Sequence, residues 1–296
     1  MNIVYKNINQ VQTPLILLGN PLIDSENVII CITGNPGISE FYIDFASELY
    51  RCTSIPVCVI GHAGHEESLD KNNKYLFNLN DQLEHKLDFI ENHIDKNSKI
   101  HLIGHSIGAW MILELLQKHN QLNERISSVN LLFPTIQKMA ESRNGKFVNN
   151  VLRKIYKFIL FLGTLLFLLP KHVLHCLIGL YLWVKSLPPK FNSAIMKILN
   201  PDVAANIFYL AFNEMDTVKS LNTDSIQNVK HITNVVYASN DGWTPLEYME
   251  HLKQFTPHLQ MIELHNVEHA FVLKSSEQVA GIVADFIITK TSVCNL

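Results

Sequence analysis

Gly104-His105-Ser106-Ile107-Gly108 lies where an apolar, partly β-branched run gives way to a longer apolar run. The preceding residues, Lys99-Ile100-His101-Leu102-Ile103, are typical of a buried strand. The following residues, Ala109-Trp110-Met111-Ile112-Leu113-Glu114-Leu115-Leu116, are typical of a buried helix. A strand, a sharp G-x-S-x-G turn and a helix form a nucleophile elbow, which exposes the serine Oγ above the end of a sheet. Ser106 is therefore the candidate nucleophile.

Two glycines allow this turn to form. Gly104 and Gly108 leave room for the strand and the helix to approach each other closely. The N-terminus of the helix then directs backbone N–H groups and a positive dipole end toward an oxyanion that forms at Ser106. A turn that merely contains a serine would carry the same short motif. The strand and helix around it favour the catalytic interpretation.

The composition predicts a protein with a large core and no nucleic-acid partner. A chain of 296 residues with 47% hydrophobic composition forms one large domain, or one domain with an insertion. A net charge of −3 and a pI near 6.5, without a basic face, give no electrostatic case for nucleic acid. Five scattered cysteines without C-x-x-C spacing indicate free thiols in a reducing compartment. The first residues lack the apolar core of a signal peptide, so we expect an intracellular protein.

Strand-like and helix-like segments alternate along most of the chain. Apolar runs at 2–5 and 14–19 predict an N-terminal hairpin. Further strands are expected at 28–32, 55–60, 99–103, 128–133, 235–238 and 260–264. Helices are expected at 39–50, 79–93, 109–116, 246–255 and 276–288. This alternation predicts βαβ units and a mostly parallel sheet with right-handed crossovers.

The segment 136–220 interrupts the alternation, and we interpret it as an inserted cap. Residues 158–169 are apolar except Gly163 and Thr164, and residues 173–184 are largely apolar. Pro170-Lys171-His172 separates the two runs. Basic residues flank them on both sides: Arg153, Lys154, Lys157, Lys185 and Lys190.

These two runs predict an apolar helical hairpin at 155–187. Each is shorter than the roughly 20 residues that cross a bilayer. A single joined span would place Lys171 near the membrane centre, at a cost of about 2.5–3.5 kcal/mol. Two short helices in one leaflet, with basic flanks at the headgroups, fit better. A buried helix pair over the active site is the other interpretation. The size of the apolar patch favours contact with a lipid surface, and a cap that is also an anchor satisfies both.

A candidate acid and a candidate base follow the last two expected strands. A serine nucleophile needs a base and a carboxylate that holds the tautomer of this base, in the chain order Ser, Asp or Glu, His. Asp241 follows the strand at 235–238, and His269 follows the strand at 260–264. Both therefore lie at the carboxyl edge of the sheet, where open α/β sheets bind ligands. Asp-Gly is also ordinary turn chemistry, and His265 is the nearest alternative base, although it directly adjoins its strand.

Two backbone N–H groups are candidates for an oxyanion hole. One belongs to Ile107, directly after the nucleophile. The other belongs to Asn35, in the loop Gly34-Asn35-Pro36-Gly37 after the strand at 28–32. A simple Pro-Gly turn is the alternative interpretation of this loop.

The segment Gly61-His62-Ala63-Gly64-His65-Glu66-Glu67 contains two histidines three residues apart. Neither H-E-x-x-H nor H-x-x-E-H is present, so we do not predict a zinc site or any other metal site. The glycines indicate a loop. We expect His62 and His65 to line the mouth of a pocket or to cap the next helix.

Five motifs together make the sequence similar to the lipid droplet-associated hydrolases, a family of α/β-hydrolases. They are 32–37 with Phe41-Tyr42, 61–65, 102–108, 241–243 with Pro245, and 269–273. The likeness covers about residues 28–285, and the G-N-P-G and D-G-W motifs are more specific than the serine elbow alone.

The resemblance implies an α/β-hydrolase fold over residues 1–296, with a mostly parallel central sheet flanked by helices and the cap at 136–220. It implies a catalytic triad of Ser106, Asp241 and His269. It also implies that the hairpin at 155–187 docks on the lipid droplet monolayer or on the cytosolic face of the endoplasmic reticulum membrane. Neutral lipid esters, sterol esters above all, are the implied substrates. The tip, Lys171-His172, is less apolar than deep insertion prefers.

We therefore expect a serine esterase that needs neither a metal nor an organic cofactor. His269 would deprotonate Ser106, Asp241 would orient the imidazole, and water would clear the acyl-enzyme. Two alternatives stay open. One is a droplet protein with weak or no catalysis that influences lipid storage. The other is acyl transfer to a different alcohol by the same triad.

Overall fold

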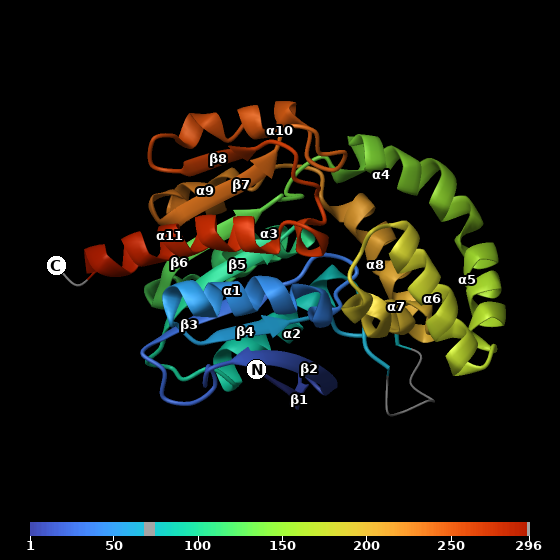
Figure 1. The fold of residues 1–296 in the computed structure, drawn as a ribbon. Helices are drawn as coiled ribbons and strands as arrows, with labels where there is room; N and C mark the ends of the chain where they lie inside the picture. Colours follow the sequence, from blue (N-terminus) through green and yellow to red (C-terminus); the bar gives the residue numbers. More distant parts are fainter. Residues whose placement is uncertain (68–74, 295–296) are drawn as a thin grey trace.

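An eight-stranded sheet forms the centre of the computed structural model, which describes residues 1–67 and 75–294 (Figure 1). The strand order is β1-β2-β4-β3-β5-β6-β7-β8. β1 pairs antiparallel with β2, β2 pairs antiparallel with β4, and all other pairs are parallel. The expected mostly parallel α/β-hydrolase sheet is thus confirmed. The strands are β1 (Asn2–Ile8), β2 (Val11–Leu18), β3 (Asn27–Ile32), β4 (Val57–Ile60), β5 (Lys99–His105), β6 (Ile126–Leu132), β7 (Thr233–Ala238) and β8 (Gln260–Leu264).

Helices cover both faces of the sheet. On one face lie α1 (Ile43–Thr53) and α11 (Ser276–Cys294), and on the other lie α2 (Leu79–Asn92), α3 (Ile107–Lys118) and α9 (Thr223–Val229). Successive residues of β3 point to opposite faces: Ile29 joins the core under α1, and Ile30 joins the core under α3. Because both faces are buried, the inner strands are continuously apolar rather than alternating.

Most of the helices between β6 and β7 gather at the carboxyl end of the sheet (Figure 1). They are α4 (Arg143–Phe147), a π-helical turn (Val148–Leu152), α5 (Arg153–Phe167), α6 (Lys171–Val184), α7 (Asn192–Leu199) and α8 (Pro201–Thr217). The remaining short helices are α10 (Leu246–Glu250) and the 3-10 turns Ser39–Tyr42, Asn120–Arg125, Met139–Glu141, Pro189–Phe191, Lys230–Ile232, Lys253–Phe255 and Phe271–Leu273.

Several element boundaries differ from those that the sequence predicts: the helix expected at 39–50 is a 3-10 turn followed by α1, and the helix expected at 276–288 continues to Cys294. The N-terminal hairpin is longer, because its strands continue to a tight turn at Asn9 and Gln10, which both have positive φ. The helix expected at 246–255 is divided into α10 and a 3-10 turn. Thr256 ends this segment ahead of Pro257, since a residue before proline disfavours helical backbone.

The hairpin of α5 and α6 exposes an apolar surface. Helix α5 has no buried residue, and α6 buries only one face, through Leu174, Ile178 and Leu182. Fourteen of the 24 exposed large apolar side chains in the described part of the chain lie between Phe147 and Val184. No single helix of the described ranges has the length and hydropathy to cross a membrane. The helical stretch Arg143–Phe167 and α6 meet this criterion only together, with a bend of 120° between them.

The elbow glycines lie where backbone segments touch. A Cβ on Gly104 would lie 2.6 Å from the backbone N of Ala109. A Cβ on Gly108 would lie 2.5 Å from the carbonyl oxygen of Ile32. Strand β5, the start of α3 and the end of β3 therefore approach each other as closely as backbones can.

We predict that Gly108→Ala lowers the melting temperature, because the added Cβ meets backbone and forces a shift that costs about 1–3 kcal/mol. Gly281→Ala is the matched control, since a Cβ on Gly281 in α11 meets nothing within 4 Å. This control should keep or raise stability by up to about 1 kcal/mol. Thermal unfolding of both variants measures the difference, and equal melting temperatures would contradict the close-approach argument.

Candidate active site

Ser106 occupies a strained turn between β5 and α3. Its φ of 53° and ψ of −119° lie in a region that residues with a side chain rarely adopt. Its N–H donates to the Leu132 carbonyl at 2.9 Å, and its own carbonyl accepts from the N–H groups of Ala109 and Thr135 at 3.1 and 3.3 Å. Such a conformation persists only where the surroundings over-determine it. These contacts hold the Ser106 side chain at the edge of a cavity.

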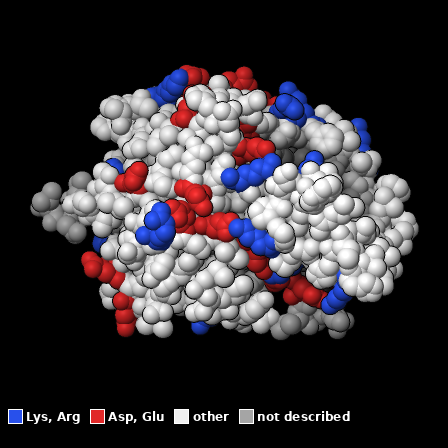
Figure 2. Space-filling model, viewed as in Figure 1, with Lys and Arg blue, Asp and Glu red and all other residues white. Residues whose placement is uncertain are grey.

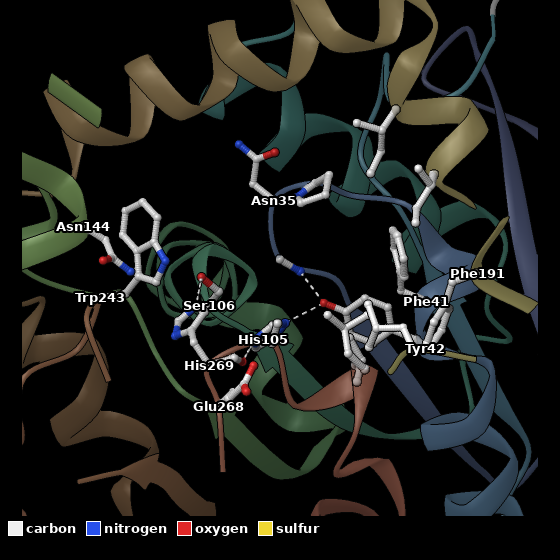
Figure 3. Close-up of a pocket in the computed structure, with 18 of the residues that line it drawn as sticks. Asn35, Phe41, Tyr42, His105, Ser106, Asn144, Phe191, Trp243, Glu268 and His269 are labelled. Carbon is white, nitrogen blue, oxygen red and sulfur yellow. Dashed lines mark hydrogen bonds between the residues drawn. The ribbon is translucent and has the colours of Figure 1, made fainter. Parts of the chain in front are cut away.

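A directional hydrogen-bond chain links the three predicted site residues. His269 Nδ1 lies 2.6 Å from Asp241 Oδ2, and His269 Nε2 lies 2.9 Å from Ser106 Oγ. The carboxylate only accepts, so Nδ1 carries the proton and Nε2 accepts from the serine hydroxyl. The three side chains come from the loops after β5, β7 and β8, and Figure 3 shows His269 directly beside Ser106. This arrangement is able to take a proton from Ser106 during attack on a carbonyl.

The environment of Asp241 favours its charged form. Its carboxylate is fully buried, and its Oδ1 accepts the N–H groups of Trp243 at 2.7 Å and Thr244 at 3.4 Å. Burial alone raises the pKa of this carboxyl, but the hydrogen bonds from His269 and from the turn outweigh burial and hold the pKa below its ordinary value. A role in the Asp-Gly turn and a role beside His269 are therefore compatible for Asp241. Its Oδ1 accepts from the turn, and its Oδ2 pairs with His269.

The rival histidines lie elsewhere. His265 Nδ1 pairs with Ser239 Oγ at 3.0 Å and is not among the residues that line the cavity. The expectation that His62 and His65 line the pocket mouth or cap a helix is wrong. Both are buried beside Gly37, whose N–H donates to His65 Nδ1 at 2.8 Å. Helix α2 is instead capped by Asn78. Within residues 1–67 and 75–294, no three His, Cys, Asp or Glu side chains form a metal-binding group.

The loop Gly34–Gly37 approaches the elbow closely. A Cβ on Gly34 would lie 3.0 Å from the Cβ of Ser106, so any other residue here would push against the elbow. The N–H of Gly34 donates to Tyr42 Oη at 2.8 Å. The N–H groups of Asn35 and Ile107 have no acceptor among the described residues. These two predicted donors are therefore available to a ligand.

The side chain of Asn35 is anchored to helix α8. Its Nδ2 donates to the Ile207 carbonyl at 3.2 Å and to Glu214 Oε1 at 3.0 Å. Glu214 is buried, and burial raises its pKa to about 8. The sequence offers no signal for this contact, because Glu214 stands in an otherwise ordinary amphipathic helix 179 residues away.

A cavity of about 590 Å³ opens above Ser106. One wall is apolar and comes largely from the helices between β6 and β7, with Tyr181, Leu187, Phe191, Ile195 and Ile198 beside Phe41. Asn144, Trp243 and Glu268 also line the cavity, and Figure 3 shows Asn144 and Trp243 on the other side of Ser106 from Phe41 and Phe191. The size falls within the range of about 300–1,000 Å³ that is typical of small-molecule sites.

We predict that the free energy of unfolding falls as pH rises from about 5.5 to 8 through Glu214. Between its ordinary pKa of 4.5 and the raised pKa of about 8, only the folded chain keeps this proton. The slope contributed is at most about 1.4 kcal/mol per pH unit. Glu214→Gln should flatten the slope in denaturant titrations at several pH values. Glu84→Gln, at an exposed position of α2, is the control. An unchanged slope in Glu214→Gln would contradict the prediction.

Known proteins resemble this chain in sequence and in fold. Two solved structures superpose on nearly all of it: a bacterial membrane phospholipase A, with a TM-score of 0.69 and 14% identity over 98% of this chain and 86% of its own, and an esterase from Thermogutta terrifontis, with a TM-score of 0.66 and 15% identity over 98% and 99%. At this identity the likeness shows the fold alone.

Relatives with similar sequences identify the family within this fold. The lipid droplet-associated hydrolase of Drosophila melanogaster is 36% identical over 97% of this chain and 98% of its own. The protein of that name from Homo sapiens is 34% identical over 87% and 83%. The sequence model of the lipid-droplet associated hydrolase family matches residues 25–272. The chain therefore belongs to the lipid droplet-associated hydrolase family.

Proposed function

We propose that this protein hydrolyses carboxylic esters of lipids with Ser106 as the nucleophile, His269 as the base and Asp241 as the residue that orients His269. One observation carries the proposal: the hydrogen-bond chain of 2.6 and 2.9 Å that ends on a serine held at the edge of a cavity. Membership in a family of hydrolases and the α/β-hydrolase fold support it.

The reaction follows from this geometry. Ser106 Oγ forms a bond to the ester carbonyl carbon while its proton moves to His269 Nε2. The N–H groups of Asn35 and Ile107 stabilise the negative oxygen. Collapse breaks the bond to the alcohol, which leaves with the proton from His269. Water then attacks the acyl-enzyme, gives its proton to His269, and the acid is released as Ser106 regains that proton.

The cavity supports a lipid ester as the substrate. At about 30 Å³ per water-sized group, 590 Å³ holds about twenty such groups, which suits one long acyl chain with its ester. We propose neutral lipid esters as the class, with sterol esters among them. The acyl chain lies along Phe41 and Phe191, whose rings pack 5.5 Å apart, and the remainder of the lipid stays outside.

Charge is segregated between the cap helices and the rest of the chain. Between Glu141 and Asp202 there are nine Lys and Arg and no Asp or Glu, whereas the remaining chain has 15 basic and 27 acidic residues. Arg153, Lys190 and Lys197 pair with acidic residues. The other six are exposed and form no ion pair within the described residues: Arg143, Lys146, Lys154, Lys157, Lys171 and Lys185. In Figure 2 the lobe formed by α5 and α6 shows few charged side chains.

An apolar face with basic edges suits a phospholipid-covered lipid surface. We propose that the hairpin of α5 and α6, residues 155–187, docks on the lipid droplet monolayer or on the cytosolic face of the endoplasmic reticulum membrane. Tyr181 connects this docking face to the active site, because it is 49% exposed and also lines the cavity. Substrate therefore passes from the lipid surface beside α6 to Ser106. The names of the relatives support only the lipid droplet part of this proposal.

We predict that Ser106→Ala abolishes labelling by a fluorophosphonate probe and reduces ester hydrolysis to background, a loss of about 10⁴-fold or more. Purified protein is assayed with a panel of sterol esters, acylglycerols and short-chain esters. Ser292→Ala, at an exposed serine of α11, is the control and should keep wild-type labelling.

The products decide between the remaining activities. Free acid as the main product with an added alcohol present supports hydrolysis, whereas a new ester indicates acyl transfer. Full-strength labelling of Ser106→Ala would overturn the assignment of the nucleophile. Unlabelled and inactive wild-type protein would leave only a non-catalytic role at the droplet.

We predict that docking depends on both apolar contact and anionic lipid. Flotation with phosphatidylcholine-coated droplets should increase when phosphatidylserine is added, because each Lys or Arg near an anionic surface contributes about 1 kcal/mol. Leu180→Glu with Trp183→Glu should prevent binding to either surface. A triple Gln variant of Lys154, Lys157 and Lys171 should lose only the anionic increment, by about 10–100-fold.

Leu246→Glu is the control for the docking variants, since Leu246 is an exposed apolar residue of α10, outside the hairpin. It should float like the wild type. Wild-type flotation by Leu180→Glu with Trp183→Glu would contradict docking through this face. An anionic increment that survives in the triple variant would contradict the role of the lysines.

A further inference from the structure

A buried hydrogen-bond chain joins the three loops that surround Ser106. The N–H of Gly34 lies 2.8 Å from Tyr42 Oη, and Tyr42 Oη lies 2.6 Å from His105 Nδ1. His105 Nε2 lies 2.9 Å from the carbonyl oxygen of His269. Figure 3 shows the first two of these bonds as dashed lines that converge on Tyr42. The chain thus runs from the Asn35 loop, through the elbow, to the backbone of the candidate base.

Every hydrogen bond in this chain has one allowed direction. The His269 carbonyl only accepts, so His105 Nε2 carries the proton. A neutral His105 then accepts at Nδ1, and the Tyr42 hydroxyl must donate to it. The Gly34 N–H donates to the Tyr42 oxygen. A chain with a single proton arrangement fixes the relative positions of the groups that it joins.

The surroundings keep His105 neutral. His105 and Tyr42 are buried, and burial, with repulsion from a charged His269, lowers the pKa of His105 to about 3. Burial raises the pKa of Tyr42 well above its ordinary value. Phe271 and Phe133 pack edge-on against the His105 ring, with centroids 5.0 and 6.2 Å away. The hydrogen-bond chain from Gly34 to His269 therefore keeps the same proton positions across the neutral pH range.

We infer that Tyr42 and His105 are positioning residues for the hydrolysis proposed above, on which this inference rests. Tyr42 occupies the N–H of Gly34, so the next amide along the loop, that of Asn35, is the one left for the oxyanion. His105 holds the backbone of His269, so that the imidazole stays aligned on Ser106 Oγ. Neither residue exchanges a proton with the substrate. Both act by keeping the oxyanion donor and the base at a fixed separation.

The test compares variants that break the chain with one that preserves it. Tyr42→Phe and His105→Leu each remove a link, whereas His105→Gln keeps one N–H donor and one carbonyl acceptor. A misplacement of about 1 Å at a reacting group costs about 10²-fold. Tyr42→Phe and His105→Leu should therefore lower kcat and the fluorophosphonate labelling rate by about 10–100-fold. KM should change little, since Tyr42 and His105 line the cavity beside Ser106 but lie outside the apolar wall of Tyr181, Phe191 and Ile195.

The conservative variant and the controls make the outcome decisive. His105→Gln should recover most of the rate lost in His105→Leu. Tyr50→Phe, at an exposed tyrosine of α1, should label like the wild type. All rates are measured per folded molecule, with melting temperatures recorded alongside. Wild-type rates in folded Tyr42→Phe, or equal losses in the Leu and Gln variants, would overturn the inference while leaving the proposed hydrolysis intact. Failure of the wild type to label would overturn both.

Discussion

The left-handed backbone of Ser106 is the constraint on which the site depends. A serine with φ of 53° is unfavourable by itself, so strand β5, helix α3 and the loop after β6 must hold it from three sides. Strand β5, the start of α3 and the end of β3 approach each other closely only because Gly104 and Gly108 carry no side chain. This strained conformation places the Ser106 hydroxyl at the N-terminus of α3 and at the carboxyl edge of the sheet. The loops after β3, β7 and β8 lie at the same edge.

The loops around Ser106 are tied to different parts of the fold. Asp241 and Trp243 fix the base from one side, through side-chain and backbone bonds within a short turn. Asn35 is held from the other side by Glu214 of α8, which makes the oxyanion loop depend on the cap helices. The sheet positions the proposed nucleophile and base, and the cap helices help to position the loop that carries Asn35.

Local sequence was sufficient for some features and not for others. The fold class and the positions of Ser106, Asp241 and His269 follow from strand periodicity and chain order, which are readable over a few residues at a time. The links from Tyr42 to His105, from His105 to His269 and from Asn35 to Glu214 join residues 63, 164 and 179 positions apart. Only packing brings them together. His62 and His65 were misplaced for the same reason, since a glycine-rich loop signals exposure unless a second loop covers it.

Helix α6 explains why we propose that the hairpin contacts an apolar phase. A helix that is apolar on all sides is stable only where every side is covered. One side of α6 packs through Ile178 and Leu182 onto Phe191, next to the cavity. The other side leaves Trp183 and Val184 at 78% and 64% exposure, although the helix continues to be apolar there. Nothing in the described chain covers these side chains. Because α6 is apolar on all sides, its sequence shows no clear helical period. For the same reason α6 separates the cavity on one side from, as we propose, the lipid that supplies substrate on the other.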